Sequence, residues 1–331
     1  MSTEKPLPPA SSVEGVFRYL DATAEPSLRR NGKVLTRRDG DGSDDEWIGV
    51  NLVPRGVAVQ DARALETDAP RTLARHGFER IDGALPDPDL DFLDHERVVR
   101  RYYPHCEALI REATGARRVA AFDHNVRSAA GKRGRHRIRG GQQVQGPAHV
   151  VHGDYTLTSA AQRLRDLCRP PGGNDTLRFA LAAGEALLDA DEVEAAVAGG
   201  RFGIVNVWRN IAAEPVAVNP LAMCDAATVD VEDLVVFEIH YADRVGENYF
   251  AKFAERHDWY YYPALARDEA LLLKQWDSAG ALAASDGASA DSALPEAPCT
   301  FSFHSAFEDP STPADAPDRW SIEVRCAVLH D

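Results

Sequence analysis

The sequence is poor in cysteine and in positive charge. Its 331 residues include five cysteines, which are scattered and form no Cys-x-x-Cys pair. This usage excludes a disulfide scaffold and a zinc ribbon, and it is typical of a reducing compartment. Lysine and arginine number 37 against 52 aspartates and glutamates, which gives a formal net charge of −15. A general nucleic-acid-binding protein needs a basic surface, so this class is excluded as well.

Long apolar segments are also missing. No run approaches the ~20 apolar residues of a transmembrane helix. The N-terminus, MSTEKPLPPASSVEG, lacks the apolar core of a signal peptide. We therefore expect a cytoplasmic protein whose partners are neither membranes nor nucleic acids. No pattern in the sequence indicates an oligomeric state.

The composition predicts one folded domain behind a short tail. Residues 1–14 are rich in proline, serine and threonine, and we expect them to be disordered. Hydrophobic residues make up 44% of the chain and charged residues 27%, which are ordinary globular values. One elaborated β-barrel domain over 15–331, with its core at about 115–331, accounts for the length.

Helical patterns come early in the chain and strand patterns come late. We expect helices within 88–116, ended by Gly115, and at 158–169 and 189–200. Residues 267–278 are typical of a helix running into a strand, and 279–298 of a flexible Ala/Ser-rich surface loop. Strand-like segments lie at 201–209, 233–242, 248–253, 258–263, 299–307 and 321–329. This order indicates an α+β protein with a mainly β core, a sandwich or jelly-roll barrel.

The segment HVVHGDYT, residues 149–156, carries a His-x-Asp pair. Side chains alternate along a strand, so His152 and Asp154 share one face. In CTFSFHSAF, residues 299–307, the same alternation places His304 on the face opposite the phenylalanines. Two histidines and one carboxylate are the facial ligand set of non-haem Fe(II) oxygenases. We therefore predict that His152, Asp154 and His304 bind Fe(II).

An Arg-x-Ser pair follows the second histidine of this set. Three protein ligands leave three metal positions open, which suit a bidentate 2-oxo acid and O₂. Arg319, fifteen positions after His304, can bind the far carboxylate of 2-oxoglutarate through two hydrogen bonds, and Ser321 can add one. Arg325, on the same strand face, is the alternative anchor. It could instead pair with a buried carboxylate such as Glu323 or Asp225.

Other polar residues are candidates for a substrate pocket. We expect Arg127, Thr156 and Gln275 to supply polar contacts there. Arg209 either binds a substrate acid or braces the barrel, and the pattern favours neither. The basic segment GKRGRHRIRGG, residues 131–141, is typical of a solvated surface loop. The alternative is a flap that meets an anionic substrate or co-substrate.

Longer motifs in the second half of the chain resemble a known family. They are FDHNVR from 122, VHGDYT from 151, NVWRNI from 206, PVAVNPLAMCDAATV from 215, WYYYPALARDEALLLKQWDS from 259 and FHSAFEDPSTPADAPDRWSIEVR from 303. Over about residues 80–329 the chain is similar to the AsaB-like (CmcJ-like) hydroxylase/desaturase family of bacterial and fungal secondary metabolism. One departure is Asn210-Ile211, where the family more often has a proline after the matched Arg209.

The resemblance implies both a fold and an activity. The fold is a double-stranded β-helix, a jelly-roll or cupin-like barrel with flanking helices. The activity is that of an Fe(II)/2-oxoglutarate-dependent dioxygenase that hydroxylates or desaturates a small molecule. His152, Asp154 and His304 would be its iron ligands, and Arg319 its 2-oxoglutarate anchor.

Two other functional classes compete with this hypothesis. A cupin-type metal-dependent hydrolase or isomerase could use the same three ligands without O₂ or 2-oxoglutarate. A non-catalytic binding barrel would retain no metal.

Overall fold

The computed structural model describes residues 12–32, 35–37, 46–48, 51–173, 175–240 and 244–331. The first strand begins at Ser12, inside the predicted tail, and residues 1–11 lie outside the described part. One hydrophobic cluster joins buried residues from the strands of two sheets with those of helices α2 (Tyr103–Thr114) and α5 (Ala190–Ala198). No described helix is both long and apolar enough to cross a bilayer.

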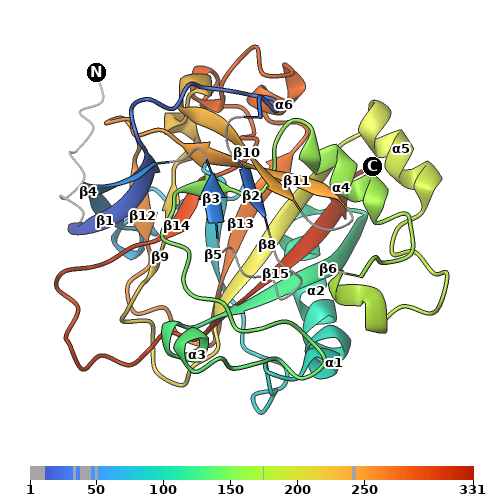
Figure 1. Ribbon diagram of the computed structural model, residues 1–331, viewed down its shortest axis with the longest axis horizontal. Helices are drawn as coiled ribbons and strands as arrows, with labels where there is room; N and C mark the ends of the chain where they lie inside the picture. The colour runs from blue at the N-terminus through green and yellow to red at the C-terminus, as the bar shows by residue number, and fades with distance from the viewer. Residues whose placement is uncertain (1–11, 33–34, 38–45, 49–50, 174, 241–243) are drawn as a thin grey trace.

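Two sheets form the body of the protein (Figure 1). The smaller sheet has the order β5-β13-β8-β15-β6, and all its neighbours are antiparallel. Its strands are β5 (Phe78–Asp82), β6 (Arg118–Arg127), β8 (Phe202–Asn210), β13 (Glu269–Asp277) and β15 (Ser321–Leu329). The larger sheet has the order β1-β4-β12-β9-β14-β7-β11-β10-β2-β3. Its strands are β1 (Ser12–Leu20), β2 (Leu35–Arg37), β3 (Glu46–Ile48), β4 (Leu52–Asp61), β7 (His152–Gly153), β9 (Leu221–Cys224), β10 (Leu234–His240), β11 (Val245–Ala251), β12 (Trp259–Tyr261) and β14 (His304–Ala306).

From β6 onward the chain winds between the two sheets. Strands β6, β8, β13 and β15 belong to the smaller sheet, and β7, β9, β12 and β14 to the larger one. Two four-stranded groups, β13-β8-β15-β6 and β12-β9-β14-β7, result from this winding. That arrangement is the double-stranded β-helix, so the predicted fold is confirmed, with its core beginning at Arg118.

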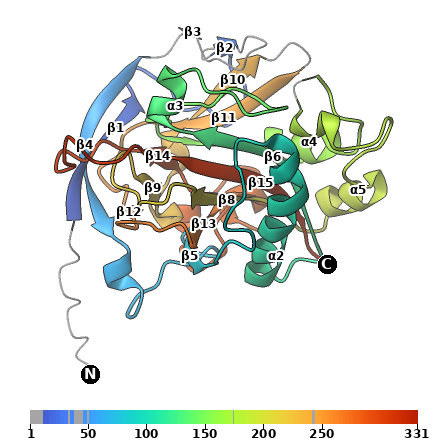
Figure 2. The same cartoon turned by 90° about the horizontal axis from the view of Figure 1, so that it is seen from below.

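Helices cover the sheets without entering the barrel. The predicted helix within 88–116 consists of α1 (His95–Arg97), a π-helical turn (Val98–Tyr102) and α2 (Tyr103–Thr114). It ends at Gly115, whose φ of 65° favours glycine, and α2 contacts β6 and β15 (Figure 2). The other α-helices are α3 (Ala129–Arg133), α4 (Ser159–Asp166), α5 (Ala190–Ala198) and α6 (Ala281–Ala284). Short 3₁₀ turns lie at Arg63–Leu65, Thr176–Phe179, Ala226–Thr228, Val231–Asp233 and Asp291–Ala293.

Two predictions about the region 267–298 are wrong. Residues 269–277 form strand β13 throughout, paired with β5 and β8, and no helix precedes it. A continuous apolar run such as Leu271–Leu273 has no helical or strand period of its own, so its neighbours decide its structure. The Ala/Ser-rich segment is ordered rather than flexible. Its buried Asp291 accepts hydrogen bonds from the Leu282 and Thr300 backbone N–H groups and from the Thr300 hydroxyl.

Replacing Asp291 with alanine should therefore destabilise the protein markedly. The change leaves three buried donors without their acceptor, which costs about 2–4 kcal/mol in the free energy of unfolding. Urea denaturation followed by circular dichroism measures this. Glu296→Ala, in the same segment but 84% exposed at its side chain, is the control and should change stability by less than about 0.5 kcal/mol. Equal, small effects of both changes would show that the segment contributes little to stability.

Candidate active site

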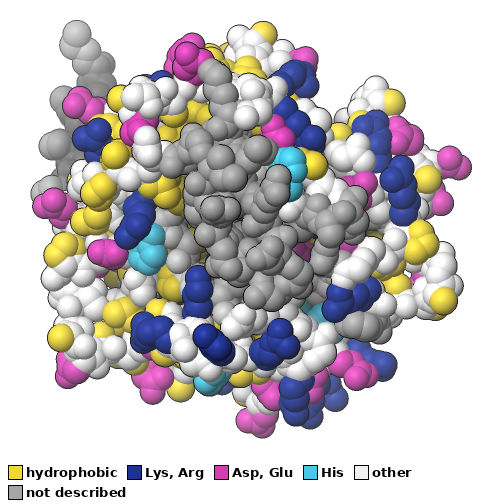
Figure 3. Space-filling model, in the orientation of Figure 1, with side chains coloured by type: hydrophobic (Ala, Val, Ile, Leu, Met, Phe, Trp, Pro, Cys, Tyr) yellow, Lys and Arg dark blue, Asp and Glu magenta, His cyan; other side chains and the backbone are white. Residues whose placement is uncertain are grey.

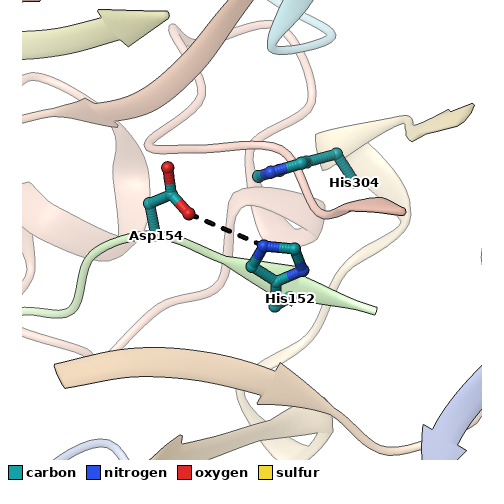
Figure 4. Close-up of side chains that lie close together, drawn as sticks. All are labelled: His152, Asp154 and His304. Atoms are coloured by element: carbon teal, nitrogen blue, oxygen red, sulfur yellow. Dashed lines mark ion pairs between the residues drawn. The ribbon is translucent and has the colours of Figure 1, made fainter. Parts of the chain in front are cut away.

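The winding of the chain brings the two predicted histidines together. Strands β7 and β14 are neighbours in the larger sheet, and His152 lies directly opposite His304 in their register. The two ring centroids are 4.4 Å apart. Asp154 follows β7, and its Oδ1 lies 3.6 Å from His152 Nε2. Each of the three side chains offers one possible ligand atom within 4.8 Å of the others, and all three point toward a common centre (Figure 4).

Both histidines are held in the neutral form that metal ligation requires. Nδ1 of His152 donates a hydrogen bond to the Val150 carbonyl at 2.8 Å, which leaves Nε2 as an acceptor facing Asp154. Burial, reinforced by the neighbouring His304, lowers the pKa of His152 to about 4. Burial also lowers the pKa of His304. Nδ1 of His304 is buried and has no hydrogen-bond partner among the described residues.

The carboxylate of Asp154 is fixed on one side and open on the other. Its Oδ2 accepts hydrogen bonds from Asn206 Nδ2 at 3.1 Å and from Arg325 Nε at 3.2 Å. Gln275 Oε1 accepts from the Asp154 backbone N–H at 3.2 Å. Burial raises the pKa of Asp154, but the Arg325 cation outweighs it and holds this pKa well below its usual range. An ionised carboxylate therefore presents Oδ1 to the two imidazoles.

Arg319 lies beside the histidines and forms no ion pair with a described carboxylate. Its side chain is buried, donates to the Asn219 carbonyl and lies 5.6 Å from the centre of the Trp208 ring. No carboxylate pairs with it among the described residues, and its Nε and the Ser321 hydroxyl are buried without partners. Burial and the nearby Arg127 lower the pKa of Arg319 to about 9. A narrow cavity connects Arg319 with His152 and His304.

Arg325, the alternative anchor, is already fully paired. Its guanidinium contacts Asp154 at 3.2 Å, Asp123 at 3.1 Å and Glu323 at 3.0 Å. The structure thus gives Arg325 the pairing with Glu323 that the sequence offered as its other role. Asp225, the second carboxylate considered for it, instead pairs with Arg71 at 3.2 Å.

The four expected pocket residues have four different surroundings. Arg127 lines both the narrow cavity and a larger one beside the triad. Gln275 lines neither cavity and instead holds the Asp154 backbone. The expectation for Thr156 is wrong, because its buried hydroxyl donates to Glu247 at 2.6 Å and accepts from the Ser159 N–H at 3.1 Å. The same hydroxyl accepts from the Thr158 N–H at 3.2 Å, just before α4 begins.

Arg209 is fully buried and is held by hydrogen bonds to neighbouring segments. Its Nε donates to the Tyr102 hydroxyl at 2.9 Å, and its Nη1 donates to the carbonyls of Gly83 and Arg267. Along β8, the alternation that turns Asn206 toward Asp154 turns Arg209 the other way, toward the π-helical turn. Arg209 lines neither cavity, and these contacts are the ones that the bracing hypothesis expects.

A large cavity opens beside the triad. Its volume is about 1440 Å³, and His152, Asp154 and Arg325 form part of its lining. Phe250, on β11, stacks on His152 with ring centroids 5.9 Å apart, and Phe237 packs against Phe250. The sequence reasoning missed Phe250 and the contact of Asn206 with Asp154. A polar residue inside the apolar strand RFGIVNVWR was the signal available for Asn206.

The chain is similar to several known proteins. A family model described as an oxidoreductase/YMDC permease-like domain matches residues 19–329. An uncharacterised protein of the dcmA 3' region of Methylophilus leisingeri is 44% identical over 61% of this chain and 92% of its own. The hydroxylase/desaturase poxK of Penicillium oxalicum is 28% identical, over 84% of this chain and 80% of its own.

One relative has a solved structure. The Fe(II)/2-oxoglutarate-dependent dioxygenase nvfI of Aspergillus novofumigatus is 30% identical in sequence, over 84% of each chain. A solved structure of the iron and alpha-ketoglutarate-dependent endoperoxidase NvfI superimposes with a TM-score of 0.69, over 96% of this chain and 98% of that one. The chain therefore belongs to the oxidoreductase family of this model, and with it to the Fe(II)/2-oxoglutarate-dependent oxygenases that the sequence motifs resemble.

Proposed function

We propose that His152, Asp154 and His304 hold Fe(II) in this oxygenase, and that Arg319 and Ser321 bind 2-oxoglutarate beside it. The substrate is a small molecule of the secondary-metabolite type, which is hydroxylated or desaturated. The observation that carries the proposal is a His-Asp-His cluster beside a buried arginine whose Nε has no partner and which forms no ion pair with a described carboxylate.

The donor set suits Fe(II). Two neutral imidazoles and one ionised carboxylate form the facial triad of this metal and leave room for further ligands. The arginine suits a 2-oxo acid. A guanidinium and a hydroxyl, both with unused hydrogen-bonding atoms, can take the far carboxylate of 2-oxoglutarate and remove the cost of the buried charge.

The residues around the metal site have separable tasks. Iron bound there supplies the activation of O₂, coupled to oxidative decarboxylation of 2-oxoglutarate. Asn206, Gln275 and Arg325 fix Asp154 so that only Oδ1 is available to the metal. Val150 fixes the tautomer of His152. Phe250 and Phe237 give the cavity an apolar wall that excludes water and positions the carbon to be oxidised.

The two competing classes lack this support. The hydrolase or isomerase hypothesis gives no role to an unpaired buried arginine beside the metal ligands. The binding-barrel hypothesis gives no role to ligands whose tautomer and ionisation suit a metal.

The five cysteines are all unpaired, and four of them are buried, which supports the expected cytoplasmic location.

Metal removal tests the proposed function directly. Protein treated with a chelator and then dialysed should form no succinate from 2-oxoglutarate under air. Fe(II) should restore succinate formation, and Zn(II) should not, because zinc has no redox chemistry. Succinate is quantified by liquid chromatography, with an anaerobic sample as the control. Restoration of any activity by zinc in the absence of O₂ would instead support the hydrolase class.

A further inference from the structure

The lining of the large cavity is rich in cations, although the protein as a whole is acidic. The whole chain has a formal net charge of −15. Among the described residues that line the cavity, nine are arginine or lysine and four are aspartate or glutamate. A cavity with one prevailing sign of charge concentrates ligands of the opposite sign. Figure 3 shows Lys and Arg side chains gathered over α3 and the loop that follows it.

The positive and apolar parts of the lining come from different elements. The apolar wall consists of Phe237 and Ile239 of β10 and Phe250 of β11, next to His152. The basic part includes Lys132 and Arg135, which belong to α3 and the turn after it. A molecule that fits both parts has an apolar body close to the triad and an acidic group further out.

Several other cations of the lining already pair with carboxylates. Arg163 and Arg244 share the carboxylate of Asp175, and Arg30 pairs with Glu247. Lys132 and Arg135, by contrast, are exposed and make no ion pair with a carboxylate among the described residues. Their charges are therefore available to a ligand.

The turn that carries these two cations is held in place. The Ser128 side chain caps α3 by accepting from the Gly131 N–H at 2.8 Å. A Cβ on Gly131 would lie 2.7 Å from the Trp320 ring, so the helix packs closely there. Backbone bridges join Arg127 to Gln145 and Arg137 to Gln143. Lys132 and Arg135 are thus presented at a fixed place on the cavity wall.

We propose that the substrate is an amphipathic organic anion whose carboxylate, phosphate or sulfate group is bound by Lys132 and Arg135. Its apolar part lies against Phe237 and Phe250, next to His152. That this anion is the substrate of the oxygenase rests on the proposed function, whereas its binding in the cavity does not. The anion site is distinct from the Arg319 cavity assigned to 2-oxoglutarate.

Dye binding to the full-length protein, loaded with Fe(II) and 2-oxoglutarate without O₂, tests this proposal. Anilinonaphthalene sulfonate is an apolar body with one sulfonate, and phenylnaphthylamine is nearly the same body without charge. We expect the sulfonate to bind more tightly than the neutral dye. Lys132→Gln/Arg135→Gln should weaken sulfonate binding by about tenfold and leave the neutral dye unaffected.

The same loop provides a matched control. Arg133 and Arg137 do not line the cavity, so Arg133→Gln/Arg137→Gln removes the same charge from outside it. This variant should bind the sulfonate like wild type. Displacement of the dye by decanoate or decyl phosphate, but not by decanol, would support the proposal and show which acidic group is preferred.

Two results would overturn the proposal. One is equal binding of the charged and neutral dyes by the wild-type protein. The other is an equal loss of sulfonate binding in both double variants, which would mean that only overall charge matters. Thermal unfolding shows that the variants are folded. Dye binding needs neither O₂ nor turnover, so a failure of succinate formation would count against the proposed function and leave this result standing.

Discussion

Asp154→Ala is expected to abolish both Fe(II) binding and succinate formation. Asp154 is the only carboxylate of the cluster, and its Oδ1 is the atom left free by Asn206 and Arg325. Removing a residue that merely supports a metal ligand costs about 10–100-fold in affinity or activity, and removing the ligand itself should cost more, about a thousandfold. Metal content after anaerobic loading and succinate yield under air measure the two effects.

Asp123→Ala is the matched control for this change. Asp123 also pairs with Arg325, at 3.1 Å, but it is not part of the metal cluster. Its removal takes one carboxylate from the same guanidinium, so it reproduces the electrostatic disturbance without removing a ligand. We expect this variant to bind one equivalent of Fe(II). If both variants lost iron equally, the charge network around Arg325, rather than ligation by Asp154, would explain the loss.

The sequence could predict what depends on local pattern. The strand expected at 321–329 has the bounds observed for β15. Polar and apolar residues alternate at its start, from Ser321 to Arg325, and this period is typical of a strand. The same alternation places Glu323 and Arg325 on one face, and they pair at 3.0 Å. The His-Asp-His cluster could also be predicted. Each of its two segments shows the alternation of a strand, and two histidines with one carboxylate form a known ligand set.

The sequence could not predict contacts that depend on the meeting of distant strands. Arg325 forms ion pairs with Asp123 of β6 and with Asp154, which follows β7. Only the pairing of β15 with β6 and the closure of the barrel bring the three side chains together. For the same reason the local pattern favours a pocket role for Thr156, although its hydroxyl donates to Glu247 of β11. A buried polar side chain forms hydrogen bonds or ion pairs with the groups that the fold places beside it. Those groups can be named only when the topology is known.

Arg319→Met is expected to raise the KM for 2-oxoglutarate by about 100-fold. A hydrogen bond to a charged group contributes about 1.5–3 kcal/mol, and about 2.7 kcal/mol corresponds to that factor. The kcat at saturating 2-oxoglutarate should fall much less, because the proposed site has Arg319 at the end of the co-substrate remote from the metal. Ser321→Ala, which removes one neutral donor, should raise the KM by about five- to tenfold. Steady-state succinate formation at varied 2-oxoglutarate measures both variants.

The same substitution should have an unusual effect on stability. Arg319 is a buried charge without a carboxylate partner, so its replacement by methionine should leave the free protein as stable as wild type or more stable. Arg325→Met should instead cost about 3–5 kcal/mol in the free energy of unfolding, because it leaves three buried or half-buried carboxylates without their cation.

Thermal unfolding with and without 2-oxoglutarate shows which of the two arginines binds the co-substrate. The co-substrate should raise the Tm of wild type and not that of Arg319→Met. If it stabilised Arg319→Met as strongly as wild type, Arg319 would not be the anchor, since a ligand stabilises only the form that binds it.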